Sequence, residues 1–527
     1  MKKINDTIRG FLREANDFYA ITVKEGTLPR WLSKILLWGT SLYATVVSVL
    51  SIYDYRLPIL LSIVWFLLFY VLIAKMLKTL VDLRVNEEKK SNDIISVKHI
   101  MGGLFLVYAI IVLSAGSYSS PDTDNQWNQV LTGVYDDWHP VIHTWTIWLI
   151  SRIFESYTFV VLVQCGIFSV LCGWLYSVLT KYNYRTWVKW GILIFTAFSP
   201  ASLTLMRVLW KDTAFALAAM ALSIISVHLW HTRGKWLKHP LHMAGFVFVI
   251  LLVSFYRHNG IFLSIPYLVL LPFVFKGWKM KLYSISVVIL SGIALFGYLQ
   301  VRTSLNGTLI QEKCTYQGFA EAVGLPMSMM AEVFVNDYER TPEETKQFLL
   351  KFSPYDFWKA AYRGDYNSVK FAIPGESGQI ISDAYTPADF LKLFFKTAKA
   401  SPVRAVKSLL HVTALAWAPF YETHHAWFGP PRTGRFFNNE LNGILSLATL
   451  FPLGCIFVNP GFYLLLFVIF AVYSFIRKGF GVLFLTIPFI AYTFGTALLL
   501  TGWDYRFFFV LGLCVLPQCL ASLANPE

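Results

Sequence analysis

Acidic and aromatic side chains gather in one short stretch, residues 118–143, which is the part of the sequence best suited to chemistry. Paired carboxylates accept a proton from an attacking hydroxyl, or hold a metal ion that neutralises a phosphate. The stretch contains no lysine or arginine, so positively charged partners for these carboxylates must come from elsewhere in the chain. Its acidic residues and histidines are Asp122, Asp124, Asp136, Asp137, His139 and His143.

Cations occur in three short polar breaks between apolar runs. These breaks are Lys211-Asp212, Arg257-His258-Asn259 and Asp504-Tyr505-Arg506. A charge at membrane depth is costly to keep, so such residues usually mark a functional site. We expect them to meet the aspartates and to bind an anionic, amphiphilic substrate, such as a lipid-linked phosphate, through charge-assisted hydrogen bonds. The competing interpretation is that the Lys211/Asp212 and Asp504/Arg506 pairs are structural and cap membrane spans.

The composition identifies the surroundings of this site. Of 527 residues, 56% are hydrophobic and only 14% are charged, whereas a soluble domain has about a quarter charged residues. The sequence therefore predicts a polytopic membrane protein. The net charge of +14 resides in short loops between apolar runs, which indicates membrane orientation and not nucleic-acid binding. The six cysteines form no CxxC pair, so neither a metal centre nor a disulfide scaffold is expected.

Apolar runs close to the roughly 20 residues that cross a bilayer predict an all-α bundle of 12 to 14 spans. The first 30 residues are polar and lack the apolar core of a signal peptide. Two weaker runs, 403–420 and 441–458, leave the topology open: both span, or the first lies on the outer surface and the second is re-entrant. The expected organisation is a cytoplasmic segment 1–30, a transmembrane module 31–301 with its outer loop 118–140, an extracytoplasmic, largely helical insert 302–402, and a second transmembrane module 403–527.

Basic loops fall almost entirely on one side when the spans are counted, and this side is expected to be cytoplasmic. The N-terminus then lies in the cytoplasm. The aspartate-rich loop and the three cationic breaks lie together on the outer face of the cell membrane.

Two parts of the sequence resemble the C-type (GT-C) membrane glycosyltransferases, in an uncharacterised bacterial branch. Asp122-Thr-Asp124-Asn-Gln-Trp127, followed by Asp137-Trp-His139-Pro140, resembles the first extracytoplasmic loop of these enzymes. Asp504-Tyr505-Arg506-Phe507 resembles the Arg-Tyr step that opens the last helix in many bacterial members. The insert at 302–402 is placed as those enzymes often place theirs.

The resemblance implies an inverting transferase that moves a sugar from a polyprenyl-phosphate donor to an envelope glycan, a glycolipid or a protein. It implies that the essential carboxylate is Asp122 or Asp124, with Asp122 favoured because it lies nearer the membrane. A divalent cation, Mg²⁺ or Mn²⁺, remains an open requirement. The residues expected to bind substrate are Asp136, Asp137, His139, Lys211, Asp212, Arg257, His258, Asn259, Asp504 and Arg506.

Other functions compete with this one. A transporter or flippase for lipid-linked saccharides would normally show two related halves, and no internal repeat is visible. A polysaccharide polymerase or ligase would depend on the insert more than on the early aspartates. A non-catalytic membrane assembly factor would show no turnover at all.

Overall fold

The computed structural model describes residues 2–53, 55–84, 95–136, 139–305, 323–370, 386–420 and 453–525. In these ranges every regular element is a helix, and the only β-type pairing is an isolated bridge between Tyr118 and Val208. This confirms the all-α membrane fold. Within the described ranges, eight helices are long and apolar enough to cross a bilayer, and five further apolar helices are shorter.

The eight long helices are α2 (Arg30–Ile52), α3 (Ile59–Arg84), α4 (Val97–Ala115), α7 (Tyr157–Lys181), α10 (Lys211–His231), α13 (Trp278–Leu305), α24 (Pro460–Lys478), and η6 (Tyr505–Phe508) continuing into α26 (Phe509–Leu523). The shorter apolar helices are α6 (Val141–Ser151), α8 (Thr186–Phe198), α11 (Pro240–Phe255), η2 (His258–Gly260) continuing into α12 (Ile261–Val274), and α25 (Ile487–Ala497).

Four of the apolar runs that we count as spans in the sequence, residues 190–208, 241–256, 260–275 and 480–500, form shorter or broken helices. The run 190–208 divides at Ser199, which caps the helix α9 (Pro200–Leu205), because a proline is favoured in the first turn of a new helix. The run 480–500 divides into the 3-10 helix η5 (Phe480–Leu485) and α25, again with a proline at the start of the second helix. The runs 241–256 and 260–275 form α11 and α12, with 16 and 14 residues.

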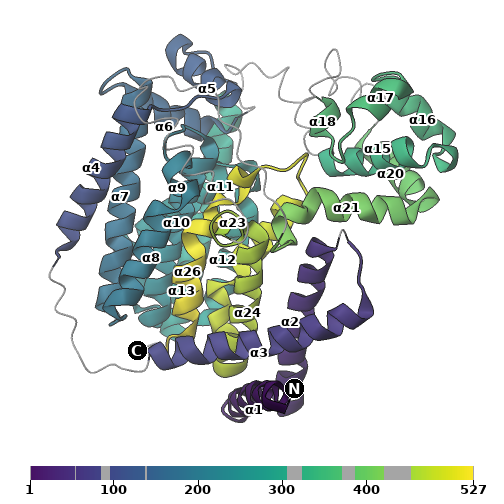
Figure 1. Ribbon diagram of the computed structural model, residues 1–527. Coiled ribbons are helices and arrows are strands. Elements are labelled where there is room, and N and C mark those ends of the chain that lie inside the picture. The colour runs from purple at the N-terminus through teal and green to yellow at the C-terminus, as the bar shows by residue number, and fades with distance from the viewer. Residues whose placement is uncertain are drawn as a thin grey trace.

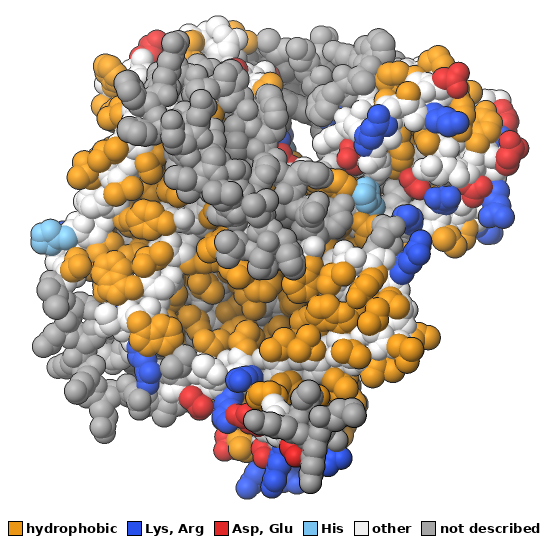
Figure 2. Space-filling view, viewed as in Figure 1, with side chains coloured by type: hydrophobic (Ala, Val, Ile, Leu, Met, Phe, Trp, Pro, Cys, Tyr) orange, Lys and Arg blue, Asp and Glu red, His pale blue; other side chains and the backbone are white. Residues whose placement is uncertain are grey.

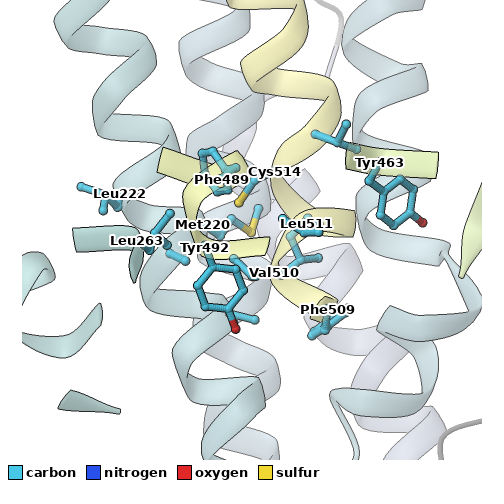
Figure 3. Packing of buried hydrophobic residues seen from close by; sticks show 14 of the residues in the cluster. Met220, Leu222, Leu263, Tyr463, Phe489, Tyr492, Phe509, Val510, Leu511 and Cys514 are labelled. Carbon is cyan, nitrogen blue, oxygen red and sulfur yellow. The ribbon is translucent and has the colours of Figure 1, made fainter. Parts of the chain in front are cut away.

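Helix α10 is the central helix of the bundle. Nearly all of its residues are buried, and it packs against α26, α7 and α11. Small side chains such as Ala216 and Ala219 permit this close approach of neighbouring helices. Figure 3 shows Met220 and Leu222 of α10 among Phe489, Leu511 and Cys514 of the C-terminal helices. This packing positions α10, whose first residues are Lys211 and Asp212, at the centre of the bundle.

The described part of the insert forms a separate helical cluster with its own core. Its elements are α15 (Gly324–Asn336), η4 (Tyr338–Arg340), α16 (Glu343–Leu350), α17 (Tyr355–Ala361), α18 (Asn367–Lys370) and α20 (Pro387–Ala400). Buried aromatic residues, among them Phe334, Trp358 and Tyr366, hold it together. In Figure 1 this cluster lies beside the end of the bundle that carries α5 (Pro121–Thr132) and α6.

Helix α21 (Pro402–Trp417) bears on the open topology of residues 403–420. In Figure 1 it runs below the insert, across the direction of the bundle helices, and it is not among the helices that are long and apolar enough to span. This arrangement favours the surface-helix alternative. The second run, 441–458, lies largely outside the described residues, which resume with α23 (Leu453–Phe457).

The opposite end of the bundle carries α1 (Lys2–Lys24) and α3 (Figure 1). Within residues 1–30, expected only as a polar segment, α1 is an amphipathic helix that buries Ala15, Tyr19 and Val23. The Tyr19 hydroxyl donates to the backbone oxygen of Tyr70 in α3, 3.1 Å away. Helix α3 runs across this end in the view of Figure 1, unlike most of the other long helices.

Candidate functional site

Helix α5 begins with a capping arrangement that fixes the position of Asp122 in its first turn. Ser120 is the N-cap: its backbone N–H donates to Thr123 Oγ1 at 2.7 Å, and the Thr123 N–H donates to Ser120 Oγ at 3.3 Å. This reciprocal pattern satisfies two backbone donors at a helix start. The indole N–H of Trp210 donates to Ser120 Oγ at 2.6 Å, which ties α5 to the residue preceding α10.

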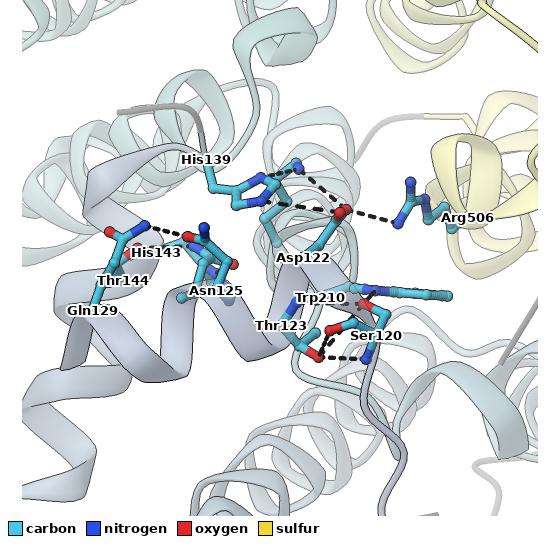
Figure 4. Close-up of polar contacts among 12 residues, drawn as sticks. Ser120, Asp122, Thr123, Asn125, Gln129, His139, His143, Thr144, Trp210 and Arg506 are labelled. Carbon is cyan, nitrogen blue, oxygen red and sulfur yellow. Dashed lines mark hydrogen bonds and ion pairs between the residues drawn. The ribbon is translucent and has the colours of Figure 1, made fainter. Parts of the chain in front are cut away.

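Three segments distant in sequence place nitrogen atoms around the Asp122 carboxylate (Figure 4). Arg506 Nη1 lies 3.0 Å from Oδ2, Lys211 Nζ lies 3.8 Å from the same oxygen, and His139 Nε2 lies 4.0 Å from Oδ1. The carboxylate is about one-third exposed, and the arginine and lysine side chains are less exposed still. The expected meeting of the first acidic residue with the late cations is therefore present in the structure.

The charges in this cluster shift two pKa values strongly. Burial opposes ionisation of Asp122, but the fields of Lys211, Arg506 and His139 outweigh it and lower the pKa of Asp122 to about 2. Burial, reinforced by Lys211, lowers the pKa of His139 to about 3. At neutral pH the site therefore contains a carboxylate and a neutral imidazole.

The hydrogen bonds also determine which His139 nitrogen carries the proton. Lys211 Nζ lies 2.8 Å from His139 Nδ1, and an ammonium group can only donate. Nδ1 is then the acceptor, so the proton is on Nε2, which faces Asp122. The imidazole thus presents an N–H group to the same space as the arginine.

A second layer of paired charges supports the first. Arg506 Nε lies 2.6 Å from Asp504 Oδ2, and Arg257 forms a buried ion pair with Asp212. Both guanidinium groups face the ring of Phe507, at 5.2 and 4.5 Å from its centroid. Arg506 thus pairs both within its own segment, with Asp504, and across to Asp122, while Lys211 and Asp212 each bind a residue from another segment.

Some expected site residues lie away from this cluster. Asp124 is exposed, because two residues along a helix turn the side chain by about 200°. The Asp136 N–H donates to Gln129 Oε1 at 3.2 Å, two helical turns from Asp122. His258 is exposed, and the buried Asn259 donates to Thr496 Oγ1 at 2.8 Å. Asp137 lies outside the described residues.

His143 has a structural role in holding α5 against α6. Its Nδ1 lies 3.1 Å from Gln126 Oε1, and the amide N–H of Gln126 donates to Thr144 Oγ1 at 2.8 Å. All three side chains are buried. The aspartate-bearing helix is therefore fixed at its first turn and again one turn later.

Lys370 is a cation whose charge interacts with that of Asp122, and the sequence did not predict this. It ends α18 of the insert, which is fixed to the bundle where the Asn367 N–H donates to the Thr501 carbonyl at 3.1 Å. Burial lowers the pKa of Lys370 to about 8, and the Asp122 charge acts against that shift. The insert thus brings a further cation within electrostatic range of Asp122. No signal in the sequence distinguishes this lysine from the others of the insert.

The donor set around Asp122 does not fit a divalent cation. Mg²⁺ and Mn²⁺ need several oxygen ligands, whereas this carboxylate faces an arginine, a lysine and an imidazole N–H. Among the residues that the structure describes, no group of three or more His, Cys, Asp or Glu side chains has the arrangement of a metal site.

Comparisons with known proteins leave the function to be argued from this geometry. No family model matches the sequence, and no curated protein matches it. Among solved structures, the chain is similar to the arabinosyltransferase EmbB from Mycobacterium smegmatis, with 10% sequence identity and a TM-score of 0.30. The match covers 80% of this chain and 45% of that one, so the chain spans less than half the length of EmbB. A likeness this low assigns neither fold family nor activity.

Proposed function

We propose that the protein is a GT-C-like membrane glycosyltransferase that moves a sugar from a polyprenyl-phosphate donor to a hydroxyl group of an acceptor. One observation carries the proposal: the Asp122 carboxylate lies against Arg506, Lys211 and His139 at one end of an apolar helical bundle. A donor of this class has a phosphate for the cations, a tail for the apolar helices, and a sugar for the carboxylate.

The proposed reaction is a single displacement with inversion. The acceptor oxygen attacks the anomeric carbon, the bond from that carbon to the phosphate oxygen breaks, and polyprenyl phosphate leaves with the electron pair. Arg506 and Lys211 stabilise the charge that develops on the phosphate, which is preorganised electrostatic catalysis. The acceptor proton passes to Asp122. The acceptor is an envelope glycan, a glycolipid or a protein on the outer face of a bacterial cell membrane.

Competition for the cations explains how an aspartate of such low pKa can act as a base. Without donor, Arg506 and Lys211 compensate the Asp122 charge and hold the pKa of Asp122 at about 2. A donor phosphate binds Arg506 and Lys211, so these cations stabilise the Asp122 carboxylate less. The phosphate also places a second negative charge near that carboxylate. Both changes raise the pKa of the carboxyl group. Donor binding therefore increases the basicity of Asp122, and the donor should bind before the acceptor.

The test is an Asp122→Asn variant of the full chain in vesicles that contain a polyprenyl-phosphate sugar. The variant keeps the side-chain shape but removes the charge, and transfer should fall by at least ~100-fold, the usual contribution of a positioned acid–base group. The control is Asp389→Asn in the insert, an exposed aspartate paired with Lys392. A variant that still transfers sugar at the normal rate would remove Asp122 from the mechanism.

Assays in the same vesicles distinguish a glycosyltransferase from a flippase and from a polymerase or ligase. Movement of lipid-linked saccharide across the bilayer without any new glycosidic bond would identify a flippase. Chain extension that survives Asp122→Asn but is lost on substituting residues of the insert would identify a polymerase or ligase.

A further inference from the structure

An apolar groove lies on the bundle far from the candidate site. It is a cavity of about 300 Å³, within the range typical of ligand pockets, between α8 and α26, with Leu80 of α3 at its edge. Its walls are Val188, Ile192 and Phe195 of α8 and Leu516 and Leu520 of α26. The face drawn in Figure 2 is hollowed and covered by hydrophobic side chains in this region. We call this cavity the α8–α26 groove.

One end of the groove is polar. The turn between α7 and α8 supplies Tyr182, Asn183, Tyr184 and Arg185, and none of the described residues that line the groove is acidic. Arg185 is the N-cap of α8 and stands before a first turn without acidic residues, where backbone N–H groups and the helix dipole favour an anion. The groove therefore joins an apolar channel to a positively charged rim.

The position of the rim separates it from the candidate site. The Tyr184 hydroxyl lies 3.3 Å from His231 Nε2, so the rim adjoins the last residue of α10. Lys211, in the candidate site, is the first residue of the same helix. A helix of 21 residues is about 30 Å long, which is the thickness of the hydrocarbon core of a bilayer. The rim and the candidate site thus face opposite leaflets.

We propose that the α8–α26 groove binds one anionic phospholipid from the leaflet opposite the candidate site. Its phosphate contacts Arg185 and the first turn of α8, and one acyl chain lies between α8 and α26. The hydrocarbon tail of a donor lipid held by Lys211 could also reach the apolar walls of the groove. That tail is uncharged, however, so it would not account for a cationic rim. Basic pockets between membrane helices are known to recognise anionic head groups. This inference does not rest on the proposed glycosyl transfer.

The test is native mass spectrometry of the purified full chain with added phosphatidylglycerol, phosphatidylcholine or polyprenyl phosphate. One phosphatidylglycerol should be retained in preference to phosphatidylcholine. Arg185→Gln should reduce this retention about fivefold, the effect of one basic residue near an anionic lipid. The matched control is Lys238→Gln, an exposed lysine in the turn between α10 and α11 that does not line the groove.

A second variant fills the groove without disturbing its walls. Gly191 lines the cavity, and a Cβ atom added there would meet no atom within 4 Å, so a larger side chain has room to start into the groove. Gly191→Leu should abolish lipid retention and leave the melting temperature unchanged or higher. Gly103→Leu in α4, also an exposed helical glycine with open space, is the control.

Three results would overturn the proposal. They are equal retention of phosphatidylglycerol and phosphatidylcholine, retention that survives Gly191→Leu, and retention of polyprenyl phosphate alone in the groove.

Discussion

The two ends of helix α10 hold polar side chains in different ways. At its start, Lys211 and Asp212 are charged and are compensated by residues from three other segments. At its end, His228 and His231 form hydrogen bonds with Tyr182 and Tyr184, at 2.9 and 3.3 Å, and His231 stacks on Tyr182 with 4.0 Å between ring centroids. Charges that are kept at a cost mark the first end as the place for chemistry, whereas aromatic hydrogen bonding at the other end is typical of a membrane anchor.

The largest effect is expected from removing the arginine that joins two carboxylates at the site end. Arg506→Gln would leave Asp122 and Asp504 without their shorter ion pairs, at 3.0 and 2.6 Å. Transfer should fall by about 10³-fold, because one preorganised donor to a developing anion contributes about that much. Arg506→Lys should restore part of the rate, since it keeps the charge but not the two-sided geometry. Initial rates in vesicles measure both, and equal rates for the two variants would show that a positive charge without the guanidinium geometry contributes nothing.

A large loss of stability is expected from breaking the buried pair at the same end. Arg257→Met would leave Asp212, which is only 2% exposed, without its ion-pair partner. Removing one partner of a buried pair costs about 3–5 kcal/mol, because the remaining charge is uncompensated. The double variant Arg257→Met/Asp212→Leu should recover most of this stability. Thermal unfolding in detergent provides the measurement, and a double variant no more stable than the single one would contradict the pairing.

A moderate, pH-dependent effect is expected from the insert. Lys370 with a pKa of about 8 loses its proton as pH rises through that value, so its positive charge in the field of Asp122 is present below pH 8 and lost above it. We expect kcat/KM to fall between about pH 8 and 9 in the normal chain. Arginine stays charged in this range, so Lys370→Arg should flatten the alkaline limb.

The control for this pH effect is Lys392→Arg on the exposed surface of the insert, which should leave the profile unchanged. If the alkaline limb persists in Lys370→Arg, another group is titrating.

The smallest effect is expected at the far end of α10. Tyr184→Phe removes one hydrogen bond to His231 and should cost about 1 kcal/mol of stability, with no change in transfer rate. Unfolding and transfer measured on the same preparation test this. A tenfold loss of transfer would show that the two ends of α10 are coupled. The end with His231 would then contribute to function and not only to stability.

Much of the fold could be predicted from single segments. Hydrophobic length predicted the helices, but several apolar runs in the described residues form shorter or broken helices, because prolines such as Pro200 begin new helices within them. The spacing of Asp122 and Asp124 could not identify which of them meets a cation until the helix start at Ser120 was known. A helix turns by about 100° per residue, so a shift of one residue in its start changes which side chain faces the bundle.

The sequence by itself determined that this chain forms apolar helices, and it singled out one short segment rich in aspartate and three short breaks that carry cations. Only the tertiary structure decided that Asp122 meets Arg506, Lys211 and His139, that Asp212 pairs with Arg257, and that Lys370 belongs to the same electrostatic environment. The physical reason is the distance along the chain over which each interaction acts. Hydrophobicity acts within each segment and can be read from it, whereas an ion pair between residues 384 positions apart depends on how every intervening helix packs.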